Sequence, residues 1–141
     1  MGYDKLAEMI KRHEGYRDRI YCDSVGVLTV GWGCALHEGK HFPAYVNERL
    51  FRNDFIGAIE DYKTLQLDLD SVREAVVIDM IFNLGIVRFK KFKNTINHIR
   101  AGEYEDAAQH MLDSKWAKQV KSRAVELAEM MRTGVWPDWF K

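Results

Sequence analysis

Near the start of the chain, mainly apolar residues recur at the spacing of one helix face. Leu6, Met9, Ile10 and His13 occupy positions i, i+3, i+4 and i+7, which indicates a short amphipathic helix. Gly15 follows at the place where a glycine commonly ends a helix. We therefore predict an N-terminal helix that ends near residue 15.

The pattern changes between Arg17 and Leu36. Short β-favouring stretches there are separated by Gly26, Gly31 and Gly33. This alternation of strand-like residues with turn glycines predicts a small antiparallel sheet with tight turns. Such a sheet is too small to be stable alone, so it must pack against other parts of the fold.

Helical patterns return after Pro43, a residue that can occupy the first turn of a helix. The segment 72–84 is apolar almost all round, as expected of a helix enclosed by others. The remaining residues read as shorter helices broken at glycines. The apolar face of the long helix after Pro43 consists of Val46, Leu50, Phe51, Phe55, Ile59 and Tyr62. The later helices are broken at Gly85, Gly102 and Gly134.

These patterns together predict an α+β fold in a single bilobed domain over residues 1–141. The small antiparallel-sheet lobe covers about residues 15–42, and the larger helical lobe covers about residues 64–141 plus the N-terminal helix. A long helix joins the two lobes. We expect a ligand cleft between them, since clefts between lobes are common binding places.

Composition narrows the function classes. The 141 residues carry 21 basic and 21 acidic side chains, and this balance removes the usual reason to expect nucleic-acid binding. No apolar run approaches the roughly 20 residues that span a bilayer, and the N-terminus lacks the apolar core of a signal peptide. We expect a protein made in the cytoplasm, without stable membrane insertion.

Cys22 and Cys34 are expected as free thiols, because a reducing cytoplasm disfavours disulfides; a disulfide between them is the alternative. Cys34, His37 and His41 lie at ligand-like spacings, with Cys22 upstream. The chain has no paired C-x-x-C motif, however, and the set falls short of a structural zinc site. We therefore predict no metal here.

Several short motifs resemble a known family. They are His13–Arg17, Tyr21–Gly26, Leu28–Gly33, Ile78–Gly85, Ser114–Trp116, Arg123–Ala124 and Arg132–Trp136. Their order and approximate spacing resemble the phage-type lysozymes, the endolysins of the T-even-phage family in glycoside hydrolase family twenty-four. The resemblance runs from Leu6 to Trp136 and implies a lysozyme-like fold.

The resemblance also implies a catalytic set. Glu14 is the expected general acid, Asp23 the partner carboxylate, and Thr29 a hydroxyl that helps to hold the attacking water. A water held between two carboxyl groups implies inversion, with the groups about 6.5–9.5 Å apart, whereas a direct nucleophile needs roughly 5–5.5 Å.

Further positions follow from the same resemblance. Arg123 is expected to approach Glu14, although an ordinary surface ion pair is the alternative. Phe82 can equally be a core residue, and His110 a plain surface histidine. The expected lining of the saccharide cleft is Ala35, Phe82, Asn83, Thr95 and His110. No metal and no cofactor are implied.

Two departures from the family pattern bear on the substrate. The connection from Leu36 to Pro43 is shorter than in larger relatives, so the sheet lobe is expected to lack one lip of the cleft. Relatives often carry a net positive charge, which favours their binding to anionic cell walls, whereas this chain has no net charge. The local cluster Arg88, Lys90, Lys91 and Lys93 either compensates or is a solvated loop.

The function implied is a muramidase that hydrolyses the β-1,4 bond between N-acetylmuramic acid and N-acetylglucosamine during phage or prophage host lysis. The expected partners are peptidoglycan glycan strands, and a monomer is expected. It would wait in the host cytoplasm and act on the cell wall or periplasm after a separate holin permeabilises the membrane. The alternatives are a lytic transglycosylase and an inactive peptidoglycan-binding module.

Overall fold

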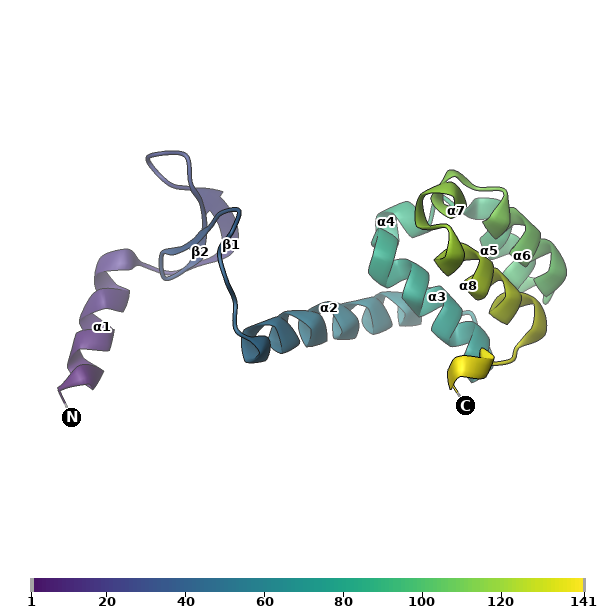
Figure 1. Cartoon of the computed structure of the whole chain (residues 1–141), viewed down its shortest axis with the longest axis horizontal. Helices are drawn as coiled ribbons and strands as arrows, with labels where there is room; N and C mark the ends of the chain where they lie inside the picture. Colours follow the sequence, from purple (N-terminus) through teal and green to yellow (C-terminus); the bar gives the residue numbers. More distant parts are fainter. Residues whose placement is uncertain (1, 141) are drawn as a thin grey trace. The chain divides into compact units, whose positions relative to one another are not determined.

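The structure is a computed structural model that describes residues 2–140, and it divides into two compact units. The first unit runs to Val46 and the second begins at Asn47. Figure 1 colours the chain from purple in the first unit to yellow at the C-terminal end of the second. Among the described residues, no helix combines the length and apolar character that crossing a membrane requires.

The first unit contains one helix and one sheet. Helix α1 (Tyr3–Glu14) ends at Gly15, whose φ of 72° is readily available only to glycine. The antiparallel sheet follows in the order β1-β2-β3. Its strands are β1 (Arg17–Cys22), β2 (Leu28–Gly31) and β3 (Cys34–Leu36). The predicted helix end and the glycine-punctuated sheet are both confirmed.

The second unit contains most of the long helix and a bundle of shorter ones. Helix α2 begins directly after Pro43, as predicted. Glycines at positions 85, 102 and 134 lie at the predicted breaks between or after helices. The helices are α2 (Ala44–Thr64), α3 (Ser71–Leu84), α4 (Ile86–Phe89), α5 (Lys93–Arg100), α6 (Tyr104–Leu112), α7 (Lys115–Val120), α8 (Ser122–Thr133) and the short 3-10 helix η1 (Asp138–Phe140).

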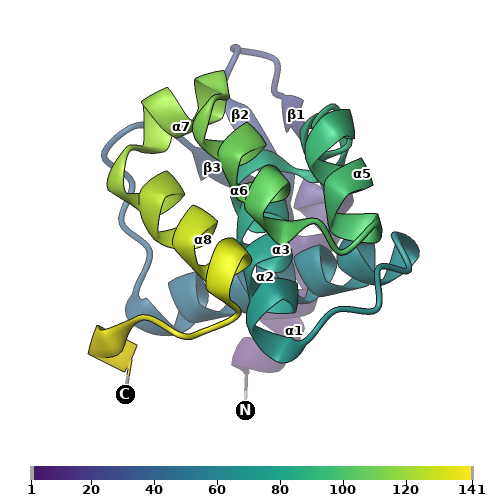
Figure 2. The same ribbon diagram turned by 90° about the vertical axis from the view of Figure 1, so that its right-hand side faces the viewer.

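Helix α3 is the centre of the bundle. Val76, Val77 and Met80 on this helix are completely buried, and α8 and α4 pack against it while α6 packs on α5 and α8. Figure 2 shows α8 beside α3, and α6 between α8 and α5. The prediction that residues 72–84 form an enclosed helix is therefore confirmed. The α+β, lysozyme-like fold class is confirmed as well, whereas the assignment of α1 to the helical lobe stays a prediction.

Arg73 secures the C-terminal end of α8. Its Nε donates to the carbonyl oxygen of Met131 at 2.7 Å, and Nη2 donates to that of Arg132 at 3.1 Å. These carbonyls belong to the last turn of the helix, where no intrahelical donor remains. The guanidinium also lies 3.7 Å from the ring centroid of Tyr104.

We expect Arg73→Met to lower the free energy of unfolding by about 1–3 kcal/mol, because the apolar stem remains while the charged donors are lost. Urea unfolding followed by circular dichroism measures this change. Arg52→Met is the matched control, since Arg52 is exposed and its nearest carboxylate, on Glu48, is 4.0 Å away. A loss at position 52 as large as that at position 73 would contradict the capping role.

Tyr62 makes the stability of the second unit depend on pH in the alkaline range. Burial and the neighbouring carboxylate of Glu74, which also hydrogen-bonds the phenol, raise the pKa of Tyr62 to about 12. In the unfolded chain the phenol loses its proton near pH 10. Between about pH 10 and about pH 12 only the unfolded state is deprotonated, so stability falls as pH rises through this window.

The corresponding loss is on the order of 2–3 kcal/mol. We expect Tyr62→Phe to remove this part of the alkaline slope, as measured by urea unfolding at a series of pH values. Tyr45→Phe is the matched control, because it makes the same chemical change at a tyrosine that is 74% exposed. A Tyr62→Phe protein with the wild-type slope would contradict the assignment.

Candidate functional site

Glu14 is the last residue of α1, and its carboxyl group lies against the sheet. A Cβ built on Gly33 would be 2.9 Å from Glu14 Cδ and closer still to Oε2. Gly33 has a φ of 73° and sits between β2 and β3. Because glycine has no Cβ, position 33 leaves room for the carboxyl group of the predicted general acid beside the turn that follows β2.

Asp23 begins the turn after β1, and backbone hydrogen bonds orient its carboxylate. Oδ1 accepts from the N–H of Val25 at 2.9 Å and from the N–H of Val27 at 2.8 Å. Gly26 closes the turn with a φ of 87°. No hydrogen bond to Oδ2 is found among residues 2–140, so this oxygen remains available to a water or a sugar.

Thr29 lies in the middle strand and is only 4% exposed. Its hydroxyl donates to the carbonyl oxygen of Val27 at 2.9 Å, the same residue whose N–H binds Asp23. The peptide groups of Val27 thus connect the two predicted site residues. Thr29 pairs with Tyr21 on β1 and with Ala35 on β3, so Ala35 is a direct neighbour of the predicted site.

Arg123 is paired within the second unit. From α8 its Nε donates to Asp79 Oδ1 on α3 at 2.8 Å, and Nη2 lies at 2.8 Å from the same oxygen. The ion-pair alternative is therefore present, whereas an approach to Glu14 stays a prediction. From the sequence, Asp79 was given no role. A signal was present, because Asp79 is the only charged residue in the stretch 76–84 and a carboxylate among apolar residues favours a charged partner.

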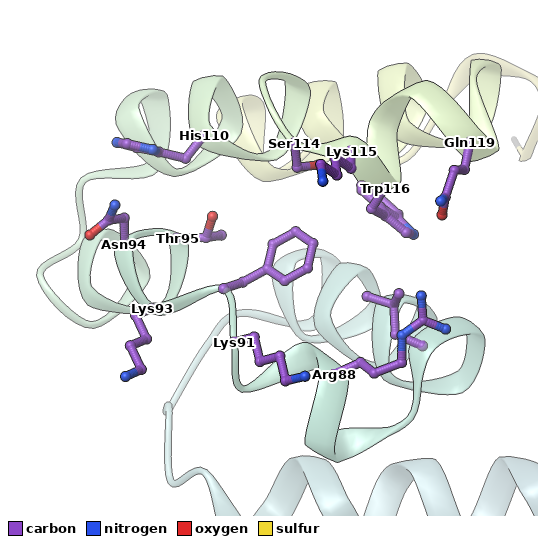
Figure 3. Close-up of a pocket in the computed structure, with 12 residues that line it drawn as sticks. Arg88, Lys91, Lys93, Asn94, Thr95, His110, Ser114, Lys115, Trp116 and Gln119 are labelled. Atoms are coloured by element: carbon purple, nitrogen blue, oxygen red, sulfur yellow. The ribbon is translucent and has the colours of Figure 1, made fainter.

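Thr95 and His110 line one pocket of about 420 Å³ (Figure 3). Its wall has four basic side chains and no acidic one: Arg88, Lys91, Lys93 and Lys115. Three of these belong to the basic cluster noted in the sequence. Lys115 could not be linked to this cluster from the sequence, because it lies in the Ser114–Trp116 motif and joins the others only through the fold. The pocket therefore favours anionic ligands.

The other predicted saccharide contacts of the second unit lie elsewhere. Asn83 Oδ1 accepts from Trp116 Nε1 at 2.8 Å, so Asn83 positions an indole that lines the basic pocket. Phe82 is 39% exposed, which argues against a plain core role. It lines a separate, mainly apolar pocket of about 480 Å³ together with Arg123.

Comparison with known proteins decides the family. The Phage lysozyme family matches residues 11–131, a span that includes Glu14, Asp23, Thr29 and most of the helical bundle. The chain belongs to the phage lysozyme family. The family resemblance drawn from the motifs is thereby confirmed.

Individual relatives of this phage lysozyme family member are distant. The chain is 23% identical over 160 aligned positions to the probable T4-type lysozyme 1 of Dictyostelium discoideum, with 92% of this chain and 94% of that protein covered. The probable T4-type lysozyme 2 of the same organism is 25% identical with the same coverage. The pre-baseplate central spike protein Gp5 of Enterobacteria phage T4 is 26% identical and matches over 28% of its length. The roles of the individual residues in this member of the phage lysozyme family stay predictions.

Proposed function

We propose that the protein is a muramidase that hydrolyses the β-1,4 bond between N-acetylmuramic acid and N-acetylglucosamine in peptidoglycan. The observation that carries this proposal is the placement of the Glu14 carboxyl group against Gly33. Because Gly33 lies in the turn between β2 and β3, this contact brings a proton donor to the same small sheet that carries Asp23 and Thr29. Glycoside hydrolysis requires such a carboxylic acid together with a second carboxylate.

The proposed reaction divides the work among three side chains. Glu14 protonates the leaving glycosidic oxygen. Asp23, with Oδ1 held by two N–H groups, stabilises the positive charge that develops on the sugar and accepts a proton from the water. Thr29 uses its only hydroxyl hydrogen on Val27, so its oxygen can accept a hydrogen bond from that water. A water in this position leads to inversion at the anomeric carbon.

Product analysis tests this proposal directly. Purified peptidoglycan digested with the protein should yield fragments with reducing ends, and proton NMR at early times should show the α anomer. A 1,6-anhydro end would instead identify a lytic transglycosylase, and an initial β anomer would overturn inversion alone. Wall binding without any cleavage would identify a catalytically inactive binding module.

The basic pocket supports a cell-wall substrate. Peptidoglycan carries carboxylates on its stem peptides, and a pocket with four cationic side chains and no acidic one attracts such groups. We expect Lys115→Glu to slow clearing of a wall suspension roughly tenfold at low salt, with the difference shrinking as salt rises. Lys118→Glu is the matched control, because it makes the same charge change on α7 outside the pocket. Equal losses for both variants would contradict the role of the pocket.

The biological setting is part of the proposal. We infer that the protein acts as a monomer on glycan strands during phage or prophage lysis, after synthesis in the host cytoplasm. A separate holin would then give it access to the wall. Expression in a bacterial host tests this: lysis should require co-expression of a holin or addition of a permeabilising agent. Lysis by the protein alone would overturn the need for a separate holin.

A further inference from the structure

Three potential metal ligands, none of them a proposed catalytic residue, meet at the hairpin between α5 and α6. His98, Glu103 and Asp106 each offer one ligand atom, and these atoms all lie within 4.8 Å of one another. One is an imidazole nitrogen and two are carboxylate oxygens. All three residues lie in the second unit, so this arrangement does not depend on the placement of the sheet.

The backbone explains why these side chains converge. His98 is in the last turn of α5, and its carbonyl oxygen accepts from the N–H of Glu103 at 2.8 Å. Gly102, with a φ of 73°, allows this reversal. Asp106 lies one turn beyond Glu103, at i+3, where two side chains share a helix face. His98 Nδ1 already lies 3.1 Å from Glu103 Oε1.

A second imidazole lies beside this group. His110 is at i+4 from Asp106, and its ring stacks on that of His98 with centroids 4.9 Å apart and an interplanar angle of 21°. A nitrogen donor with two carboxylates, next to another imidazole, suits a divalent transition metal, because imidazole favours such ions over Mg²⁺ and Ca²⁺. Zn²⁺ binds this combination of nitrogen and oxygen ligands.

We propose that His98, Glu103 and Asp106 form a binding site for a divalent transition-metal ion of the Zn²⁺ class. The site joins the end of α5 to the start of α6. The three side chains are partly or fully exposed, so water completes the coordination and the affinity is moderate. The ion also fixes the ring on which His110 stacks, and His110 belongs to the basic pocket.

A simple ion pair between His98 and Glu103 is the competing explanation of the same geometry, and at the surface such a pair contributes little stability. The two explanations differ at Asp106. An ion pair does not require this residue, whereas a three-ligand metal site does. Asp106→Asn is therefore the decisive variant, because it keeps the shape of the side chain and weakens only its donor oxygen.

Isothermal titration of the full chain with ZnCl₂, and separately with MgCl₂, tests the proposal. We expect one Zn²⁺ per chain, weak or no Mg²⁺ binding, and a rise in melting temperature with Zn²⁺ because the ion binds the folded state. Asp106→Asn and His98→Asn should each weaken Zn²⁺ binding at least about tenfold. Their circular dichroism should match that of the wild type, since neither residue is in the core.

Three controls separate this site from other zinc-binding groups. Glu105→Gln changes a neighbouring carboxylate on α6, His41→Asn removes a histidine of the first unit, and Cys22→Ser removes an exposed thiol. All three should bind Zn²⁺ like the wild type. Zn²⁺ binding that survives in both Asp106→Asn and His98→Asn, or that disappears in Cys22→Ser, would overturn the proposal, as would the absence of Zn²⁺ binding to the wild type.

Discussion

Glu14→Gln is expected to lower the rate of wall lysis by about a thousandfold, within the range that a general acid contributes. The amide has nearly the same shape as the carboxylic acid but has no proton to give to the leaving oxygen. The side chain is exposed at the end of α1, so the substitution should leave the free energy of unfolding almost unchanged. Initial rates of turbidity loss, paired with melting curves, measure both quantities.

A second glutamate on α1 provides the control for this experiment. Glu8 is exposed on the same helix, and Glu8→Gln makes the same chemical change away from Gly33. We expect Glu8→Gln to clear the wall suspension at the wild-type rate. If Glu14→Gln also cleared it at that rate, Glu14 would not be the acid. The product analysis would then have to identify another proton donor.

The helices and strands were predictable because the local pattern of apolar residues and glycines specifies them. The almost wholly apolar segment at residues 72–84 could only be an enclosed helix, and Val76, Val77 and Met80 are indeed completely buried. Likewise, the glycines between positions 26 and 33 marked tight turns, and Gly26, Gly31 and Gly33 all have positive φ. In both cases the deciding information lies within a few residues of the element it defines.

Features that join distant segments were not predictable in the same way. The pocket cation Lys115 is separated from Arg88 by α5 and α6 along the chain, and only the packed bundle brings them to one wall. The group at His98 and Asp106 depends on the hairpin that reverses the chain between α5 and α6. Family resemblance supplied Glu14, Asp23 and Thr29, but it did not reveal that the peptide groups of Val27 connect the last two.

Gly33→Ala is expected to reduce lysis by about a hundredfold, although position 33 carries no reactive group. The new methyl group would occupy the space of the Glu14 carboxyl group. This carboxyl is the far end of a flexible side chain, so it moves away at little cost to folding. A displacement of about 1 Å from the reacting bond is enough to cost two orders of magnitude in rate.

Gly31→Ala separates this effect from backbone strain. Gly31 has a φ of 67°, close to the 73° of Gly33, but a Cβ there meets no atom within 4 Å. Both variants should therefore lose a similar stability, on the order of 1 kcal/mol, in urea unfolding. Only Gly33→Ala should lose most of its activity, because only that methyl group reaches Glu14. Equal activity losses in the two variants would show that strain in the sheet, rather than displacement of the acid, limits the reaction.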